Sequence, residues 1–105
     1  MYSFTQKQLT LIELELKSLA MWASSPPSEE ALVDPTPFAC ESLAFEQWLQ
    51  FIFIPKMSQL VALKAPLPQR IALAPMAEHV WQNQPKMKRL TTLLNQLDER
   101  LSEPR

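Results

Sequence analysis

FEQWLQFIFIPKM, from Phe45 to Met57, is the stretch that decides the fold, because bulky apolar side chains crowd nearly every face of the helix that it predicts. At about 100° per residue, several of the apolar side chains before Pro55 form one broad sector that should face a core. The members of this sector are Phe45, Trp48, Leu49, Ile52 and, from beyond Pro55, Leu63. We therefore expect a central helix from about Leu43 to Lys64.

Past Pro55 the apolar pattern loses its phase. Lys56 and Gln59 fall in the apolar sector, while other apolar residues gather near the line of Glu46 and Gln50, namely Phe53, Met57, Leu60 and Val61. In one interpretation the proline kinks the axis and the two halves bury different faces, because proline lacks a donor and clashes with the preceding turn. In the other, Phe53, Lys56 and Met57 form a partly exposed patch that meets another macromolecule. The two interpretations are compatible.

Composition limits the class of protein. With 105 residues, 47% of them hydrophobic and 20% charged, the chain fits one globular domain, residues 1–105. No apolar run is long enough to span a membrane, and the amino terminus lacks the pattern of a signal peptide. The single cysteine, Cys40, cannot form an internal disulfide, which agrees with a reducing compartment. We expect a cytoplasmic protein that does not enter a membrane.

Glycine is absent and proline occurs ten times. The absence excludes phosphate-binding loops, the dinucleotide fingerprint and the hydrolase nucleophile elbow, since each needs glycine where the backbone turns tightly. Proline takes over as the residue that ends helices, notably in the connections at residues 26–37 and 66–68.

Leucine patterns predict the remaining helices. The first helix should run from Phe4 to Trp22 and the last from Pro85, while a third begins at Pro75. The last helix has the cleanest apolar stripe, which consists of Leu90, Leu94, Leu97 and Leu101. No alternating strand pattern is present, so the fold class is all-α, a small four-helix bundle with a proline-kinked central helix and proline-rich connections.

Candidate chemistry is sparse. His79 is the only histidine, and one His with one Cys is too few for a zinc site, so we expect no catalytic residue, no metal and no cofactor. Lys86, Lys88 and Arg89 gather where the last helix begins, although the helix dipole disfavours cations there by about 0.3 to 1 kcal/mol each. These three residues are candidates for binding RNA phosphates, and the alternative is a solvated start of a helix.

Several short blocks of the sequence are distinctive, namely Thr36-Pro37-Phe38, Glu46 to Gln50, Ile54 to Met57, Pro66 to Pro68 and Ala74 to Glu78. In these blocks the chain resembles the YqcC-like proteins, a family of small bacterial helical domains. The resemblance implies a compact helical bundle and a gene neighbourhood shared with tRNA pseudouridine synthase C. It does not imply that enzyme's activity, because pseudouridine synthases depend on a catalytic aspartate within a much larger mixed fold.

The first functional hypothesis is a non-enzymatic interaction module, an accessory to tRNA modification that binds tRNA pseudouridine synthase C. Its candidate partner-binding residues are Trp48, Gln50, Phe53, Pro55, Lys56, Met57, Pro66, Leu67 and Pro68. Direct RNA binding through the basic cluster is the second hypothesis. Self-association is the third, because an apolar helix can complete its burial in a dimer.

Overall fold

The structure is a computed structural model, and it describes residues 2–33, 43–68 and 71–102. Cys40 and the proline-rich block at 35–37 lie outside these residues. The described elements are helical, and in order they are α1 (Tyr2–Ser18), α2 (Glu29–Leu32), α3 (Phe45–Trp48), the π-helix η2 (Leu49–Phe53), α4 (Ile54–Ala62), α5 (Leu73–Val80), the 3-10 turn η3 (Pro85–Met87) and α6 (Lys88–Ser102). The all-α bundle is confirmed.

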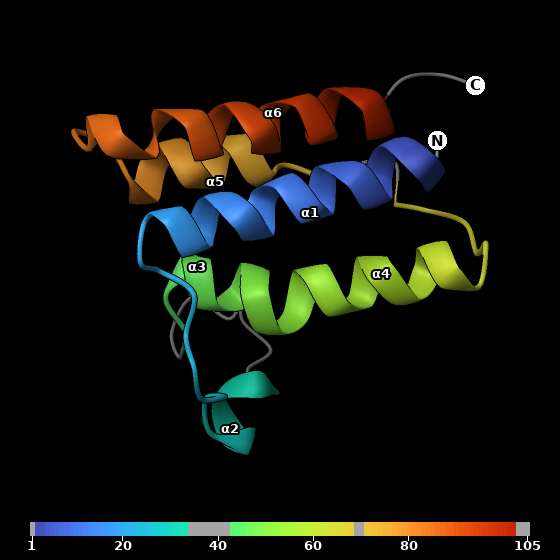
Figure 1. The fold of residues 1–105 in the computed structure, drawn as a ribbon, viewed down its shortest axis with the longest axis horizontal. Coiled ribbons are helices and arrows are strands. Elements are labelled where there is room, and N and C mark those ends of the chain that lie inside the picture. Colours follow the sequence, from blue (N-terminus) through green and yellow to red (C-terminus); the bar gives the residue numbers. More distant parts are fainter. Residues whose placement is uncertain (1, 34–42, 69–70, 103–105) are drawn as a thin grey trace.

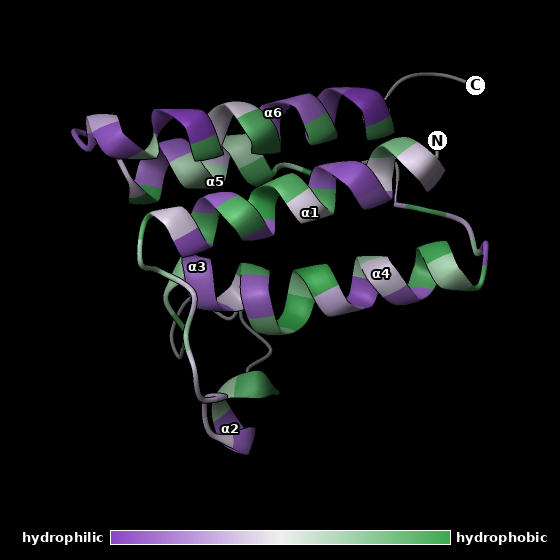
Figure 2. Ribbon diagram, viewed as in Figure 1, coloured by the Kyte–Doolittle hydropathy of each residue, from purple (hydrophilic) through white to green (hydrophobic). Residues whose placement is uncertain are grey.

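Four long rods make up the bundle, because α3, η2 and α4 follow one another without a break. In Figure 1 α1 runs between α6 and the α3–α4 rod, and α5 lies against α6, while the short α2 projects from one side. Figure 2 shows the apolar segments of α6 turned mainly toward its neighbours. The predicted stripe of α6 is confirmed, since its four leucines are fully buried, and Leu9, Ile12 and Leu16 of α1 pack into the same core.

Pro55 is accommodated by the π-helical turn that precedes it. The amide of Ile54 donates to the carbonyl of Leu49, five residues back, so the rod carries one extra residue in this turn. Each later side chain therefore moves back around the axis by about 100°. Measured from Glu46, Phe53 and Met57 then lie at about 240° and 280°, within the sector of about 200° to 300° that holds Phe45 and Leu49. The inserted residue therefore explains why the apolar pattern of the sequence shifts at Pro55.

This geometry corrects the faces that both interpretations assigned to the central helix. The two halves bury the same face, because Phe53 and Met57 belong to the same core as Phe45 and Leu49. Phe53 is 6% exposed and Met57 2% exposed, so the predicted partly exposed patch is wrong for both. Leu63, which was expected in the core, is 68% exposed, since the extra residue rotates it out of the sector.

Two helices end in Schellman caps that use residues other than glycine. After α1, the amide of Met21 donates to Leu16 and that of Ala20 to Lys17, with Ala20 at a φ of 59°. The same pair of bonds follows α4, where Lys64 has a φ of 51°. The cap at Ala20 stops α1 at Ser18, four residues before its predicted end at Trp22.

Candidate functional site

An apolar groove of about 670 Å³ runs along the α4 side of the bundle. One wall is the ridge of the α3–α4 rod, and the other is the extended chain at 66–68 together with the residues that lead into α5. Its lining residues are Trp48, Ile52, Phe53, Lys56, Met57, Leu60, Pro66, Leu67, Pro68, Ile71, Ala72 and Leu73. The prolines form a wall because a proline-rich segment cannot continue the helix and instead crosses back over it.

Seven of the nine candidate partner-binding residues line this one groove. They are Trp48, Phe53, Lys56, Met57, Pro66, Leu67 and Pro68. Phe53, Met57 and Leu67 are buried and form its floor, whereas Lys56 and Pro66 are exposed at its rim. Sequence reasoning thus selected residues that the fold brings together, and their binding of a partner stays a prediction.

Gln50 and Pro55 are not part of the groove. Gln50 is 7% exposed, and its carboxamide makes two hydrogen bonds with the backbone of Ala23. Nε2 donates to the Ala23 carbonyl and Oε1 accepts from the Ala23 amide, both at 2.8 Å. The prediction that Gln50 lies on a docking surface is therefore wrong, because its polar atoms are used to fix the chain that follows α1. Pro55 is exposed but does not line the groove.

Lys56 gives the groove its polarity. It is the one charged side chain among the described lining residues, and no carboxylate of the described residues lies within ion-pair distance of it. A cation at the rim of an apolar groove favours an apolar ligand surface that carries an acidic group.

Asp98 of α6 supports the wall of the groove, and sequence reasoning missed it. Its two carboxylate oxygens accept from the amides of Leu73 (3.1 Å) and Ala74 (2.8 Å), the first two residues of α5. The residue before α5 is Ala72, which offers no capping side chain, so α6 supplies the cap. Burial raises the pKa of the Asp98 carboxyl above its ordinary value, and the two backbone amides oppose that rise.

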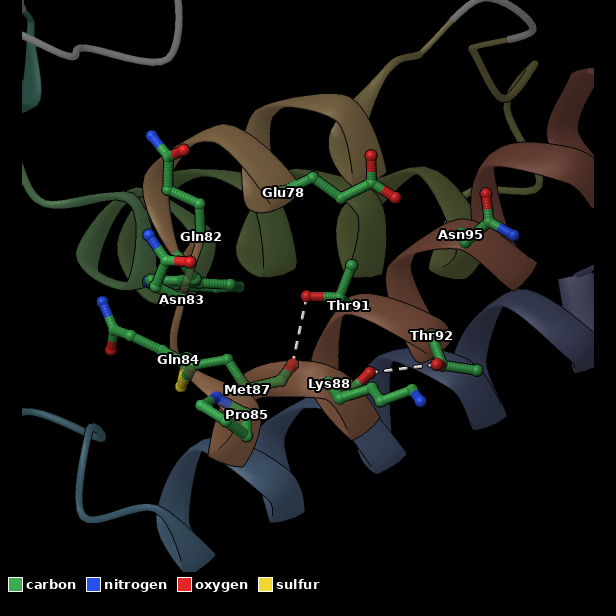
Figure 3. A pocket seen from close by; sticks show the side chains of 11 residues that line it. Glu78, Gln82, Asn83, Gln84, Pro85, Met87, Lys88, Thr91, Thr92 and Asn95 are labelled. Atoms are coloured by element: carbon green, nitrogen blue, oxygen red, sulfur yellow. Dashed lines mark hydrogen bonds between the residues drawn. The ribbon is translucent and has the colours of Figure 1, made fainter.

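A second recess of about 540 Å³ lies where α5 passes into α6. We call it the polar pocket, and its lining residues are Glu78, Trp81, Gln82, Asn83, Gln84, Pro85, Met87, Lys88, Thr91, Thr92 and Asn95. Figure 3 shows Gln82, Asn83 and Gln84 on the turn at one side, with Glu78, Thr91 and Asn95 around the opening.

The three RNA-binding candidates differ in their surroundings. Lys88 lines the polar pocket, and Lys86 is exposed two residues before it. Arg89 instead reaches α1, where its Nε lies 3.4 Å from Oε1 of Glu15, so part of its charge is already matched. This geometry does not test RNA binding, which stays a prediction.

The described residues contain neither a cluster of metal ligands nor a helix that could span a membrane. Within residues 2–33, 43–68 and 71–102, no three His, Cys, Asp or Glu side chains gather as metal ligands. His79 is exposed on α5. In the same described ranges, no helix combines the length and the hydropathy that crossing a bilayer requires.

Comparison with known proteins places these features in context. A family model, DUF446, described as tRNA pseudouridine synthase C, matches residues 4–100. A protein named as uncharacterized from Haemophilus influenzae is 32% identical over 95 residues, which cover 90% of both chains. The solution NMR structure of protein YqcC from E. coli is similar with a TM-score of 0.86 and 26% identity, covering 97% of this chain and 88% of that one.

A longer relative carries a different kind of information. A protein named tRNA pseudouridine synthase C from Pectobacterium carotovorum is 31% identical over 78 residues. The similar segment covers 74% of this chain but 21% of that protein, so most of the longer protein has no counterpart here.

Proposed function

This chain belongs to the YqcC-like family, and from that membership we propose that it is a non-enzymatic accessory domain that docks a tRNA pseudouridine synthase through its apolar groove. The observation that carries the proposal is the groove itself, which keeps Ile52, Leu60 and Ile71 half-buried beside Lys56, a cation with no ion-pair partner among the described residues. Half-buried apolar side chains around a recess gain further burial when a partner covers them.

The Pectobacterium protein supports the choice of partner. There, a segment similar to this chain forms about a fifth of a protein that bears the synthase name. Two modules joined in one chain meet at a high effective concentration, so even a weak contact between them remains formed. A domain of this kind that met the synthase on another chain would need such a contact surface, and the groove offers one.

Two groove variants test the proposal without removing core packing. Lys56→Glu reverses the rim charge and Ala72→Gln pushes a longer side chain into the groove, and both residues are exposed, so the fold should persist. We expect either change to reduce copurification of the synthase from the same cells by about tenfold or more. Lys7→Glu, the same charge change on exposed Lys7 of α1, should leave recovery unchanged.

Circular dichroism must show equal helicity for all variants. Undiminished recovery of the synthase by folded Lys56→Glu and Ala72→Gln proteins would overturn the proposal. Light scattering over a concentration series checks the third hypothesis: a dimer that dissociates in Ala72→Gln would mean that a second copy of this chain fills the groove instead.

A further inference from the structure

We propose that the polar pocket binds one nucleotide of a single-stranded RNA, with the base among the carboxamides of residues 82–84 and the phosphate at Lys86 and Lys88. This site is separate from the groove and does not depend on the docking proposal. Its volume of about 540 Å³ lies within the range of small-ligand pockets.

The side-chain chemistry of the turn points to a ligand with mixed donors and acceptors. Gln82, Asn83 and Gln84 are exposed in succession, and their carboxamides make no hydrogen bond with the described residues. A carboxamide both donates and accepts, as the edges of nucleobases do, which is why Asn and Gln read bases in pairs of hydrogen bonds.

The pocket also offers apolar surface for the face of a base. The hydroxyls of Thr91 and Thr92 are turned to their own helix, donating to the carbonyls of Met87 (3.0 Å) and Lys88 (2.9 Å) (Figure 3). The exposed Pro85 and the buried Met87 also line the recess. A flat ring can therefore rest on apolar atoms while its edge meets the carboxamides.

Charge is unevenly divided around the pocket, which suits a nucleotide and not a simple anion. Lys88 lines the pocket from the α6 side and Glu78 lines it from the α5 side, while the exposed Lys86 precedes Lys88 by two residues. A phosphate would be drawn to the lysines, whereas Glu78 repels anions and can accept from an exocyclic amine or a ribose hydroxyl. A ligand that fits both sides of the pocket therefore carries its negative charge at one end only.

The test is a titration of the isotope-labelled full chain with a short single-stranded RNA of mixed sequence, followed by NMR at several salt concentrations. We expect weak binding, with a dissociation constant on the order of 10⁻⁴ M at low salt, and shifts of the side-chain amide signals of Gln82, Asn83 and Gln84. The double variant Lys86→Gln, Lys88→Gln should weaken binding about tenfold and reduce the slope of log K against log salt by about 1.4.

Asn83→Gly separates base recognition from phosphate attraction. Asn83 has a φ of 64°, which glycine adopts freely, so the variant keeps the turn and removes one carboxamide. We expect about fivefold weaker binding with an unchanged salt slope. Lys7→Gln, which removes one charge from the exposed Lys7 of α1 outside both recesses, should change neither quantity.

Three results would overturn the inference. The first is no shift at low salt. The second is a salt slope that the lysine variants leave intact. The third is full affinity in Asn83→Gly and in Gln84→Ala, which would reduce the site to phosphate attraction alone. Because synthase capture is measured separately with groove variants, each proposal can fail without the other.

Discussion

The groove and the polar pocket are two recesses of similar size, about 670 and 540 Å³, with opposite linings. Both lie beside the same buried ring: Phe45 stacks on Trp48 of the groove at 5.8 Å and meets Trp81 of the polar pocket at 5.3 Å. The groove is made of core residues that the fold leaves partly uncovered, whereas most of the side chains that line the pocket are exposed. The shape of the groove is therefore tied more closely to stability than the shape of the pocket.

The strongest test of this difference is Phe53→Ala. Phe53 is 6% exposed, stacks on Trp48 at 5.4 Å and forms part of the groove floor, so truncation leaves a cavity in the core. We expect the free energy of unfolding to fall by about 3 to 5 kcal/mol, measured by urea denaturation. Gln84→Ala, the matched truncation in the polar pocket, should change it by less than about 0.5 kcal/mol. Similar losses for the two variants would contradict the distinction.

Asp98→Ala should give the next largest effect. Its carboxylate satisfies two amides at the start of α5, and those amides have no other partner in the first turn. We expect a loss of about 2 kcal/mol in the free energy of unfolding. Amide signals of residues 71–74, along the groove, should shift in the NMR spectrum while those of residues 82–84 hold still. Shifts of equal size at both recesses would mean that Asp98 acts on the whole bundle and not on the groove wall.

The pH dependence of stability should carry a smaller signature of the same carboxyl. Because burial raises the pKa of Asp98 above 3.8 in the folded state, the folded protein binds more protons than the unfolded chain between these two values. The stability that this group contributes therefore grows as the pH falls through the folded pKa and is complete below the unfolded one. The difference in unfolding free energy between the natural chain and Asp98→Asn should rise on acidification, and a fall would show that the two amides outweigh burial.

Much of the fold could be read from apolar spacing. The stripe of α6 and the core residues of α1 follow from i, i+3, i+4 patterns alone, since a helix with one apolar stripe has one way to bury it. The shift of the apolar pattern at Pro55 also located the π-helical turn correctly. Its form could not be predicted, because a kink and an inserted residue produce the same disturbance in sequence, and they differ only in which side chains the neighbouring helices then cover.

The hydrogen-bond partners of the buried polar residues could not be predicted from the sequence. Gln8 donates from α1 to the Leu93 carbonyl at 2.8 Å, Gln50 holds Ala23, and Asp98 caps α5, each across a long stretch of chain. A polar side chain in a helix looks the same whether its partner is water or a distant backbone group. The candidate groove residues could be found because bulky apolar side chains and prolines must lie near the core, while their degree of exposure required the packed structure.

The smallest expected effect compares the helix ends that border the two recesses. Lys64 follows the last turn of α4, just before the groove wall, and has a φ of 51°. Asn83 lies in the turn of the polar pocket and has a φ of 64°. A left-handed conformation costs an ordinary residue about 1 to 2 kcal/mol, and glycine removes that cost but loses about 0.5 to 1 kcal/mol to the entropy of the unfolded chain. Lys64→Gly should therefore stabilise the protein by about 0.5 kcal/mol in urea denaturation. Asn83→Gly should change little, because asparagine already tolerates this region. Lys64→Ala keeps the backbone cost and removes the charge, so a Lys64→Gly protein no more stable than Lys64→Ala would show that the cap carries no such strain.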